Sequence, residues 1–118
     1  MIPSIYVTAS EPQSGKSVVA LGLVELLSAR LERVGFFRPV VAADAEPDPQ
    51  IELIRRRYRL PAGYDELRAL TDREVQAALA GGSLAEVDQR VVAGFRALED
   101  RFDAIVCEGA DVAGAAPG

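Results

Sequence analysis

The residues with the clearest chemistry form a short run near the N-terminus, Ser14-Gly15-Lys16-Ser17. This run lies between a strand-like and a helix-like segment, the context in which the pattern G-x-x-x-x-G-K-[ST] binds phosphate. Backbone N–H groups at the helix start and the Lys16 ammonium would converge on an anion, and the Ser17 hydroxyl could ligate Mg²⁺. The first glycine of the pattern is missing, because Ser10 stands in its position. The run therefore predicts a phosphate site with a variant loop.

Lys16 is the only lysine among the 13 basic residues of the chain. A phosphate-binding loop needs a compact, mobile ammonium at this position, and the planar guanidinium of arginine does not fill such a slot easily. A lysine here, in a chain that otherwise uses arginine, favours phosphate binding. The alternative is a Gly-Lys-Ser that only begins a helix.

Three more charged residues lie in or after predicted strands. Glu108 comes directly after an apolar strand, as does the acid that P-loop proteins place near the metal, so it could hold Mg²⁺ directly or through water. Asp48 is a second candidate metal ligand, although it could equally be a helix cap. Arg38 could neutralise a phosphate or carboxylate, or it could be a surface residue paired with Asp44 or Glu46.

The elements that must position these residues alternate between strand and helix. Apolar and β-branched runs predict strands over residues 4–8, 36–41 and 104–107, with Pro39 near the end of the second. A largely buried helix is predicted from Lys16 to about Arg33, with Gly35 stopping it. Further helices are predicted after Asp48-Pro49 and after two capping boxes, Thr71 with Glu74 (closed at Gly81-Gly82) and Ser83 with Glu86.

This order predicts an α/β fold, a parallel sheet of about three strands with flanking helices and right-handed crossovers. Ligands of such sheets bind at the carboxyl ends of the strands. The loops after Thr8, Val40 and Cys107 therefore matter most, and they carry the candidate residues above other than Arg38, which lies in the second predicted strand.

Composition excludes several kinds of site. The chain has 118 residues, so we expect at most one domain, over residues 1–118. It has no histidine and one cysteine, which excludes catalysis by an imidazole and a disulfide within the chain. A net charge of −5 argues against binding of nucleic acid, and the arginine run of residues 55–59 is expected to be a solvated helix face rather than an anion site.

The longest apolar run, residues 18–27, is too short for a membrane span, and no targeting segment is visible. A cytoplasmic location is expected, and Cys107 is expected to be a small core residue.

Three segments resemble one family. Residues 7–17, 37–40 and 106–110 resemble the dethiobiotin synthetases, in which the first glycine of the loop is also missing. The chain is more similar still to the dethiobiotin-synthetase-like N-terminal domain of long-form bacterial phosphate acetyltransferases, through residues 15–23, 34–40 and 51–54. The resemblance covers nearly the whole chain and implies a P-loop NTPase-like fold.

The resemblance also implies a ligand set. ATP or another nucleotide and Mg²⁺ are the implied ligands, and no catalytic residue is assigned. Nucleotide contacts would come from Gln13, Ser14, Gly15, Lys16, Ser17 and Arg38, and metal contacts from Ser17, Asp48 and Glu108. Arg38, Pro12 and Asp111 depart from the synthetase pattern, and these departures put carbamate chemistry and ring closure in doubt.

Three functions remain open from the sequence. The first is a nucleotide- or metabolite-sensing and oligomerisation domain of a phosphate acetyltransferase, whose transfer of an acetyl group between acetyl-CoA and phosphate would lie in a separate C-terminal domain. The second is an ATP- and Mg²⁺-dependent ligase of the dethiobiotin type, or a small P-loop ATPase. The third is an inactive P-loop relic that serves as a packing surface. The first implies a piece of a longer protein and a homo-oligomer, and the low strand number predicts a marginally stable or self-associating chain.

Overall fold

A four-stranded parallel sheet forms the centre of the molecule. The computed structural model describes residues 2–8 and 15–109. The strands are β1 (Ser4–Val7), β2 (Val34–Val41), β3 (Arg68–Thr71) and β4 (Ala104–Glu108), in the spatial order β1-β4-β2-β3. The predicted α/β class with a parallel sheet is confirmed, while the predicted number of strands is one too few for the part of the chain described.

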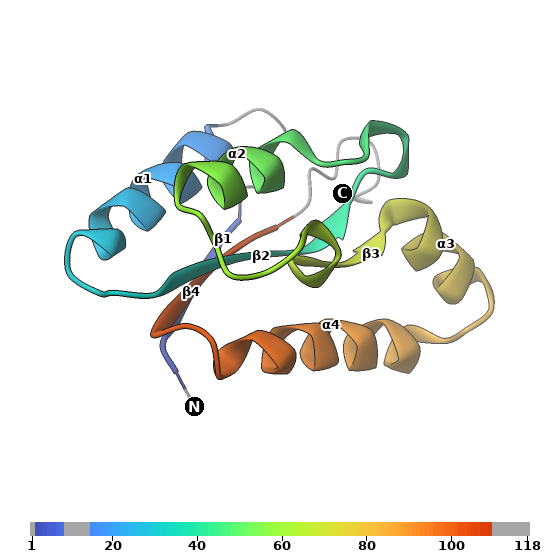
Figure 1. Ribbon diagram of the computed structural model, residues 1–118. Helices are drawn as coiled ribbons and strands as arrows, with labels where there is room; N and C mark the ends of the chain where they lie inside the picture. The colour runs from blue at the N-terminus through green and yellow to red at the C-terminus, as the bar shows by residue number, and fades with distance from the viewer. Residues whose placement is uncertain (1, 9–14, 110–118) are drawn as a thin grey trace.

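Helices cover both faces of this sheet (Figure 1). On one face lie α1 (Lys16–Ser28) and α2 (Pro49–Arg57), and on the other lies α4 (Leu84–Glu99). The shorter α3 (Asp72–Ala80) lies beyond the end of β3, and two 3-10 turns, η1 (Ala43–Ala45) and η2 (Tyr64–Glu66), complete the connections. No helix in the described ranges is both long and apolar enough to cross a membrane.

The strand that the sequence did not reveal is β3. It has four residues and begins with an arginine, so it lacks the apolar run that marked the other strands. It pairs with β2 through Arg38 with Arg68 and Val40 with Leu70. In the described sheet β3 is an edge strand that pairs on one side only, and edge strands are commonly short.

Two boundaries around β2 correct the prediction. Helix α1 ends at Ser28 rather than near Arg33, and Gly35 lies inside β2 instead of stopping the helix. The ring of Phe102 packs so closely on Gly35 that a Cβ there would lie 2.6 Å from it. Pro39 also lies inside β2 rather than at its end. Its nitrogen has no hydrogen to donate, but it faces the side of the strand on which pairing with β4 has already ended at Phe37, so the strand tolerates it.

The predicted burial of α1 is wrong. Ala20 and Val24 face the sheet and are fully buried, whereas Val18 is 75% exposed and Val19 and Leu26 are also exposed. A helix apolar around most of its circumference can bury only the side that meets the sheet. Helix α1 therefore presents an apolar outer face.

Of the two predicted capping boxes, the structure forms one. Thr71 and Glu74 form a reciprocal capping box at the start of α3, and α3 ends at Gly81 as predicted. Ser83 makes no side-chain cap to α4, so the second predicted capping box is wrong. Its backbone carbonyl instead accepts from the N–H of Glu86.

The core lies between the sheet and its helices. Its largest fully buried side chains include Phe36, Phe37, Phe102, Ile51, Leu98 and Ile105. Because all strands run parallel, the carboxyl ends of β1, β4 and β2 meet at one edge of the sheet. The polar residues that follow these strands are thereby brought together.

Candidate functional site

Helix α1 begins at the phosphate-loop lysine. Gly15 precedes it with a φ of 88°, a left-handed conformation that glycine adopts without strain. Lys16 is buried, and its ammonium donates a 2.6 Å hydrogen bond to the carbonyl oxygen of Gly109, just after β4. The N-terminus of α1 therefore points toward the carboxyl edge of the sheet, where the predicted phosphate would bind.

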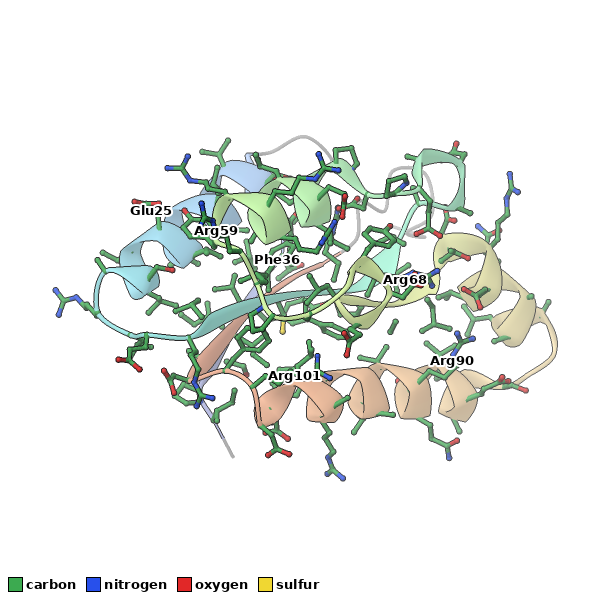
Figure 2. All side chains as sticks on the ribbon, viewed as in Figure 1. Glu25, Phe36, Arg59, Arg68, Arg90 and Arg101 are labelled. Carbon is green, nitrogen blue, oxygen red and sulfur yellow. The ribbon has the colours of Figure 1, made fainter. Side chains whose placement is uncertain are left out.

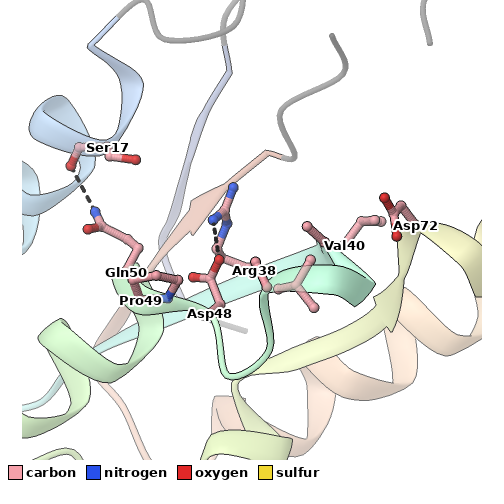
Figure 3. Close-up of a pocket in the computed structure, with 10 residues that line it drawn as sticks. Ser17, Arg38, Val40, Asp48, Pro49, Gln50 and Asp72 are labelled. Carbon is pink, nitrogen blue, oxygen red and sulfur yellow. Dashed lines mark hydrogen bonds and ion pairs between the residues drawn. The ribbon is translucent and has the colours of Figure 1, made fainter. Parts of the chain in front are cut away.

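Glu108 is the acid at the centre of the site. It ends β4 and is fully buried. Its Oε2 accepts a 2.9 Å hydrogen bond from the Ser17 hydroxyl, and its Oε1 accepts one of 3.2 Å from the Gln50 side-chain amide. The same amide donates to the Ser17 carbonyl at 2.8 Å, so Gln50 ties α2 to the start of α1 (Figure 3).

Gln50 is a site residue that the sequence reasoning missed. The available signal was its position, two residues after the predicted cap Asp48 and therefore in the first turn of a helix that starts beside the site. A side-chain amide in the first turn of α2 can reach Ser17 in the first turn of α1.

Arg38 and Asp48 form a buried ion pair. Arg38 Nη1 lies 2.8 Å from Asp48 Oδ1, and both side chains are 8% exposed. Arg38 Nη2 donates to the Gly109 carbonyl at 3.1 Å and lies 3.5 Å from Glu108 Oε2. The alternative of a surface arginine paired with Asp44 or Glu46 is wrong, because the guanidinium lies between the two predicted metal ligands.

Asp48 is also a helix cap. Its Oδ2 accepts from the N–H of Ile51 at 3.0 Å, while its own N–H donates to the Tyr64 hydroxyl at 2.7 Å. Burial, together with the hydrogen bond that Tyr64 donates to Glu46, raises the pKa of Tyr64 to about 12. The phenol thus stays protonated at neutral pH and holds the start of α2 in place.

Among the described residues of the site, the positive and negative charges are equal in number. Lys16 and Arg38 supply two cations, Asp48 and Glu108 supply two anions, and all four are buried. In a region of low dielectric, an added anion would upset this balance unless a cation came with it.

The donor set fits Mg²⁺ in part. The hydroxyl of Ser17 and the carboxylate of Glu108 are hard oxygen ligands that already lie side by side. Asp48 is engaged by Arg38, and among the described residues no three acidic or thiol side chains gather as a metal-binding group. Ser17 and Glu108 are therefore the residues placed to hold the ion. The guanidinium of Arg38 separates Asp48 from them.

A cavity of about 360 Å³ adjoins this cluster (Figure 3). It is lined by the polar side chains of Ser17, Arg38, Asp48, Gln50 and Asp72 and by the apolar side chains of Val40 and Val41, among others. Cavities of this size accommodate small molecules. The structure thus places a mixed polar and apolar cavity beside the predicted phosphate site.

The structure brings together most of the predicted site residues. Gly15, Lys16, Ser17, Arg38, Asp48 and Glu108 meet at the carboxyl edge of the sheet. Gln13, Ser14, Pro12 and Asp111 lie outside the described residues. The arginine run on α2 is a solvated face, as predicted: Arg55 and Arg56 pair with Glu52, and Arg57 pairs with Glu25.

Comparison with known proteins gives a consistent result. The family described as an AAA domain matches residues 3–117. The chain is similar to a protein of Nitratidesulfovibrio vulgaris named phosphate acetyltransferase, with 34% identity over 116 residues, which are 97% of this chain and 16% of that one. A phosphate acetyltransferase of Synechocystis sp. is 33% identical over 116 residues, 17% of its length. The chain thus spans about a sixth of the length of these relatives.

Proposed function

Because the chain belongs to the AAA domain family, we propose that it binds a nucleoside triphosphate with Mg²⁺ and acts as a nucleotide-sensing and assembly domain of a phosphate acetyltransferase. The transfer of an acetyl group between acetyl-CoA and phosphate would then take place in another part of that protein. The single cysteine, Cys107, suits a reducing compartment, so we place this function in the cytoplasm.

The observation that carries the proposal is the meeting of α1 with β4. Lys16 and Ser17 begin the helix, and Glu108 ends the strand beside them. A triphosphate at the helix N-terminus would accept hydrogen bonds from N–H groups of its first turn. Lys16 would turn its ammonium from the Gly109 carbonyl to the phosphate oxygens.

The charge balance favours the magnesium complex over the free nucleotide. Mg²⁺ supplies two positive charges that offset phosphate charge, so the complex adds less net charge to this buried cluster than the free triphosphate does. Ser17 and Glu108 would hold the ion. Arg38 keeps Asp48 neutralised and so limits the negative charge near the phosphates.

Calorimetric titration of MgATP tests the proposal. We expect the wild type to bind MgATP, the affinity to fall when EDTA removes the metal, and Lys16→Ala to weaken binding by at least about tenfold, as expected for losing a hydrogen bond to a charged group. Arg73→Ala is the matched control, since Arg73 is exposed, belongs to α3 and its substitution also removes one positive charge. Circular dichroism checks that each variant is folded. Absence of binding by the folded wild type would overturn the nucleotide part of the proposal.

The cavity beside Ser17 supports a second candidate. A ligase of the dethiobiotin type needs room for another substrate next to the terminal phosphate, and the space lined by Arg38, Gln50 and Asp72 lies there. Phosphate release during incubation with MgATP, a diamine acid and CO₂ tests this candidate. Binding of MgATP without turnover supports sensing and eliminates the ligase.

A further inference from the structure

The outer side of α4 carries a stripe that no described element covers. This α4 stripe consists of Asp88, Gln89, Val92, Ala93 and Arg96, all exposed. Val92 stands at its centre with 47% of its surface exposed, although valine is most often buried. Figure 1 shows α4 along the lower side of the molecule, with the sheet above it and no described element below it.

The charges of the stripe are arranged symmetrically about Val92. Asp88 lies four residues before it and Arg96 four residues after it. Residues four apart lie on the same side of a helix, about 6 Å apart along its axis. Among the described residues, neither Asp88 nor Arg96 forms an ion pair, whereas Arg90 on another side of α4 pairs with Glu74 (Figure 2).

We propose that a second copy of this chain docks on the α4 stripe, with the two α4 helices antiparallel about a twofold axis at Val92. The axis would set Val92 against Val92 of the second copy. Antiparallel helices reverse the order of residues, so Asp88 of each copy would face Arg96 of the other. The stripe is thus self-complementary in charge, which a twofold contact requires because both copies present the same surface.

An apolar groove extends this surface toward the sheet. It has a volume of about 590 Å³, and Val92 and Phe95 of α4 line it together with Tyr6 of β1 and Phe37 of β2. Tyr6 is 58% exposed and belongs to the edge strand of the sheet. A second copy on the α4 stripe would cover this groove and bring apolar contact area to the ion pairs.

This inference deepens the assembly part of the proposed function and rests on it. Nucleotide binding involves the carboxyl edge of the sheet, away from the outer side of α4, so the two can fail separately. Calorimetry with MgATP reports on the nucleotide site, and sedimentation equilibrium reports on the α4 stripe.

Charge reversal tests the pairing. Asp88→Arg and Arg96→Asp each place like charges across the axis twice in a dimer, and we expect each to raise the dissociation constant at least about tenfold. The double variant Asp88→Arg/Arg96→Asp restores opposite charges, and we expect its dissociation constant to return to within about threefold of the wild type. Glu86→Arg is the control for Asp88→Arg, because it changes the net charge equally on another side of α4.

Each outcome is decisive. A wild type that stays monomeric at all concentrations up to about 100 μM overturns the proposal and leaves the stripe to a different partner or segment. Self-association that both single reversals leave unchanged overturns the α4 contact while the assembly function stands. Oxidation of Val92→Cys gives a second readout, since a cysteine on the axis forms a covalent dimer only if the two copies meet there.

Discussion

The Ser17 hydroxyl donates a 2.9 Å hydrogen bond to the buried carboxylate of Glu108, across 91 positions of sequence. Ser17 lies in the first turn of α1, and Glu108 ends the last described strand. Their contact exists because β4 is inserted between β1 and β2, which brings its carboxyl end beside the loop that follows β1. The candidate site is therefore a product of strand order, and its chemistry can be tested residue by residue.

Ser17→Ala should uncouple nucleotide binding from magnesium. The hydroxyl is exposed on one side and bonded to Glu108 on the other, so its removal deletes one oxygen ligand without opening a core cavity. We expect the affinity for MgATP to fall about tenfold, and the affinity for ATP in EDTA to change less than twofold. Calorimetric titrations with and without Mg²⁺ measure both. Ser28→Ala, at the exposed end of α1, is the control. Equal losses under both conditions would count against a magnesium role for Ser17.

Asp48→Ala should be among the most destabilising single changes in the site. It leaves the buried Arg38 guanidinium without its carboxylate at 2.8 Å, which costs about 3–5 kcal/mol in comparable cases. It also removes the cap on the Ile51 N–H, worth about 1 kcal/mol. Urea denaturation measures the loss in the free energy of unfolding.

Two further variants separate these causes. Asp48→Asn keeps an oxygen that can accept from Ile51 and loses only the charge, so we expect it to lie above Asp48→Ala in stability by about 1 kcal/mol. Asp44→Ala, at a neighbouring exposed acid, should stay within about 0.5 kcal/mol of the wild type. If Asp48→Ala matched Asp44→Ala, the buried ion pair would have no energetic role.

The first part of the fold could be predicted because local signals there agree with the tertiary structure. The apolar strand, the Gly15-Lys16-Ser17 turn and the apolar helix follow one another within a short stretch of chain, and so does the Asp48 cap before Pro49. Strand β3 could not be predicted, because four residues beginning with Arg68 carry no pattern without β2 beside them. Gly35 was misinterpreted for the same kind of reason, since the ring that excludes a side chain there comes from Phe102, far along the sequence.

The site shows the same division. The loop motif and the acid after an apolar strand are local patterns, and they identified Lys16, Ser17 and Glu108. The position of the Arg38 guanidinium between Asp48 and Glu108 depends on the order of strands, which a pattern along the chain does not contain.

Cys107 should be unreactive in the folded chain and should make stability depend on pH. Burial raises the pKa of its thiol to about 11. The unfolded chain releases this proton near pH 8.5. The contribution is therefore complete below about pH 8.5 and is lost progressively as the pH rises toward 11.

The measurement compares the wild type with Cys107→Ala from pH 7.5 to 10.5. The raised pKa values of Tyr58 and Tyr64 are present in both proteins, whereas the raised pKa of Tyr6 comes first from burial and then from the charge of Cys107. The difference in the slope of unfolding free energy against pH therefore reports the thiol together with its coupling to Tyr6. We expect the wild type to have the steeper decline. At pH 8, a thiol reagent should react with the native chain much more slowly than with the chain in urea, and equal rates would contradict the burial of Cys107.

A matched pair of glycine substitutions tests why Gly35 lies in β2. Gly35→Ala adds a methyl group at 2.6 Å from the buried Phe102 ring, so we expect a loss of about 1–3 kcal/mol in the free energy of unfolding. Gly22→Ala adds the same methyl group inside α1, where nothing lies within 4 Å, and helix propensity predicts a gain of about 0.5–1 kcal/mol. Urea denaturation measures both changes in the free energy of unfolding. A loss for Gly35→Ala and a gain for Gly22→Ala would separate the effect of a close contact from the effect of backbone flexibility. If Gly35→Ala were neutral, or if it cost as much in a Phe102→Leu background as in the wild type, the contact between β2 and Phe102 would not be what requires a glycine there.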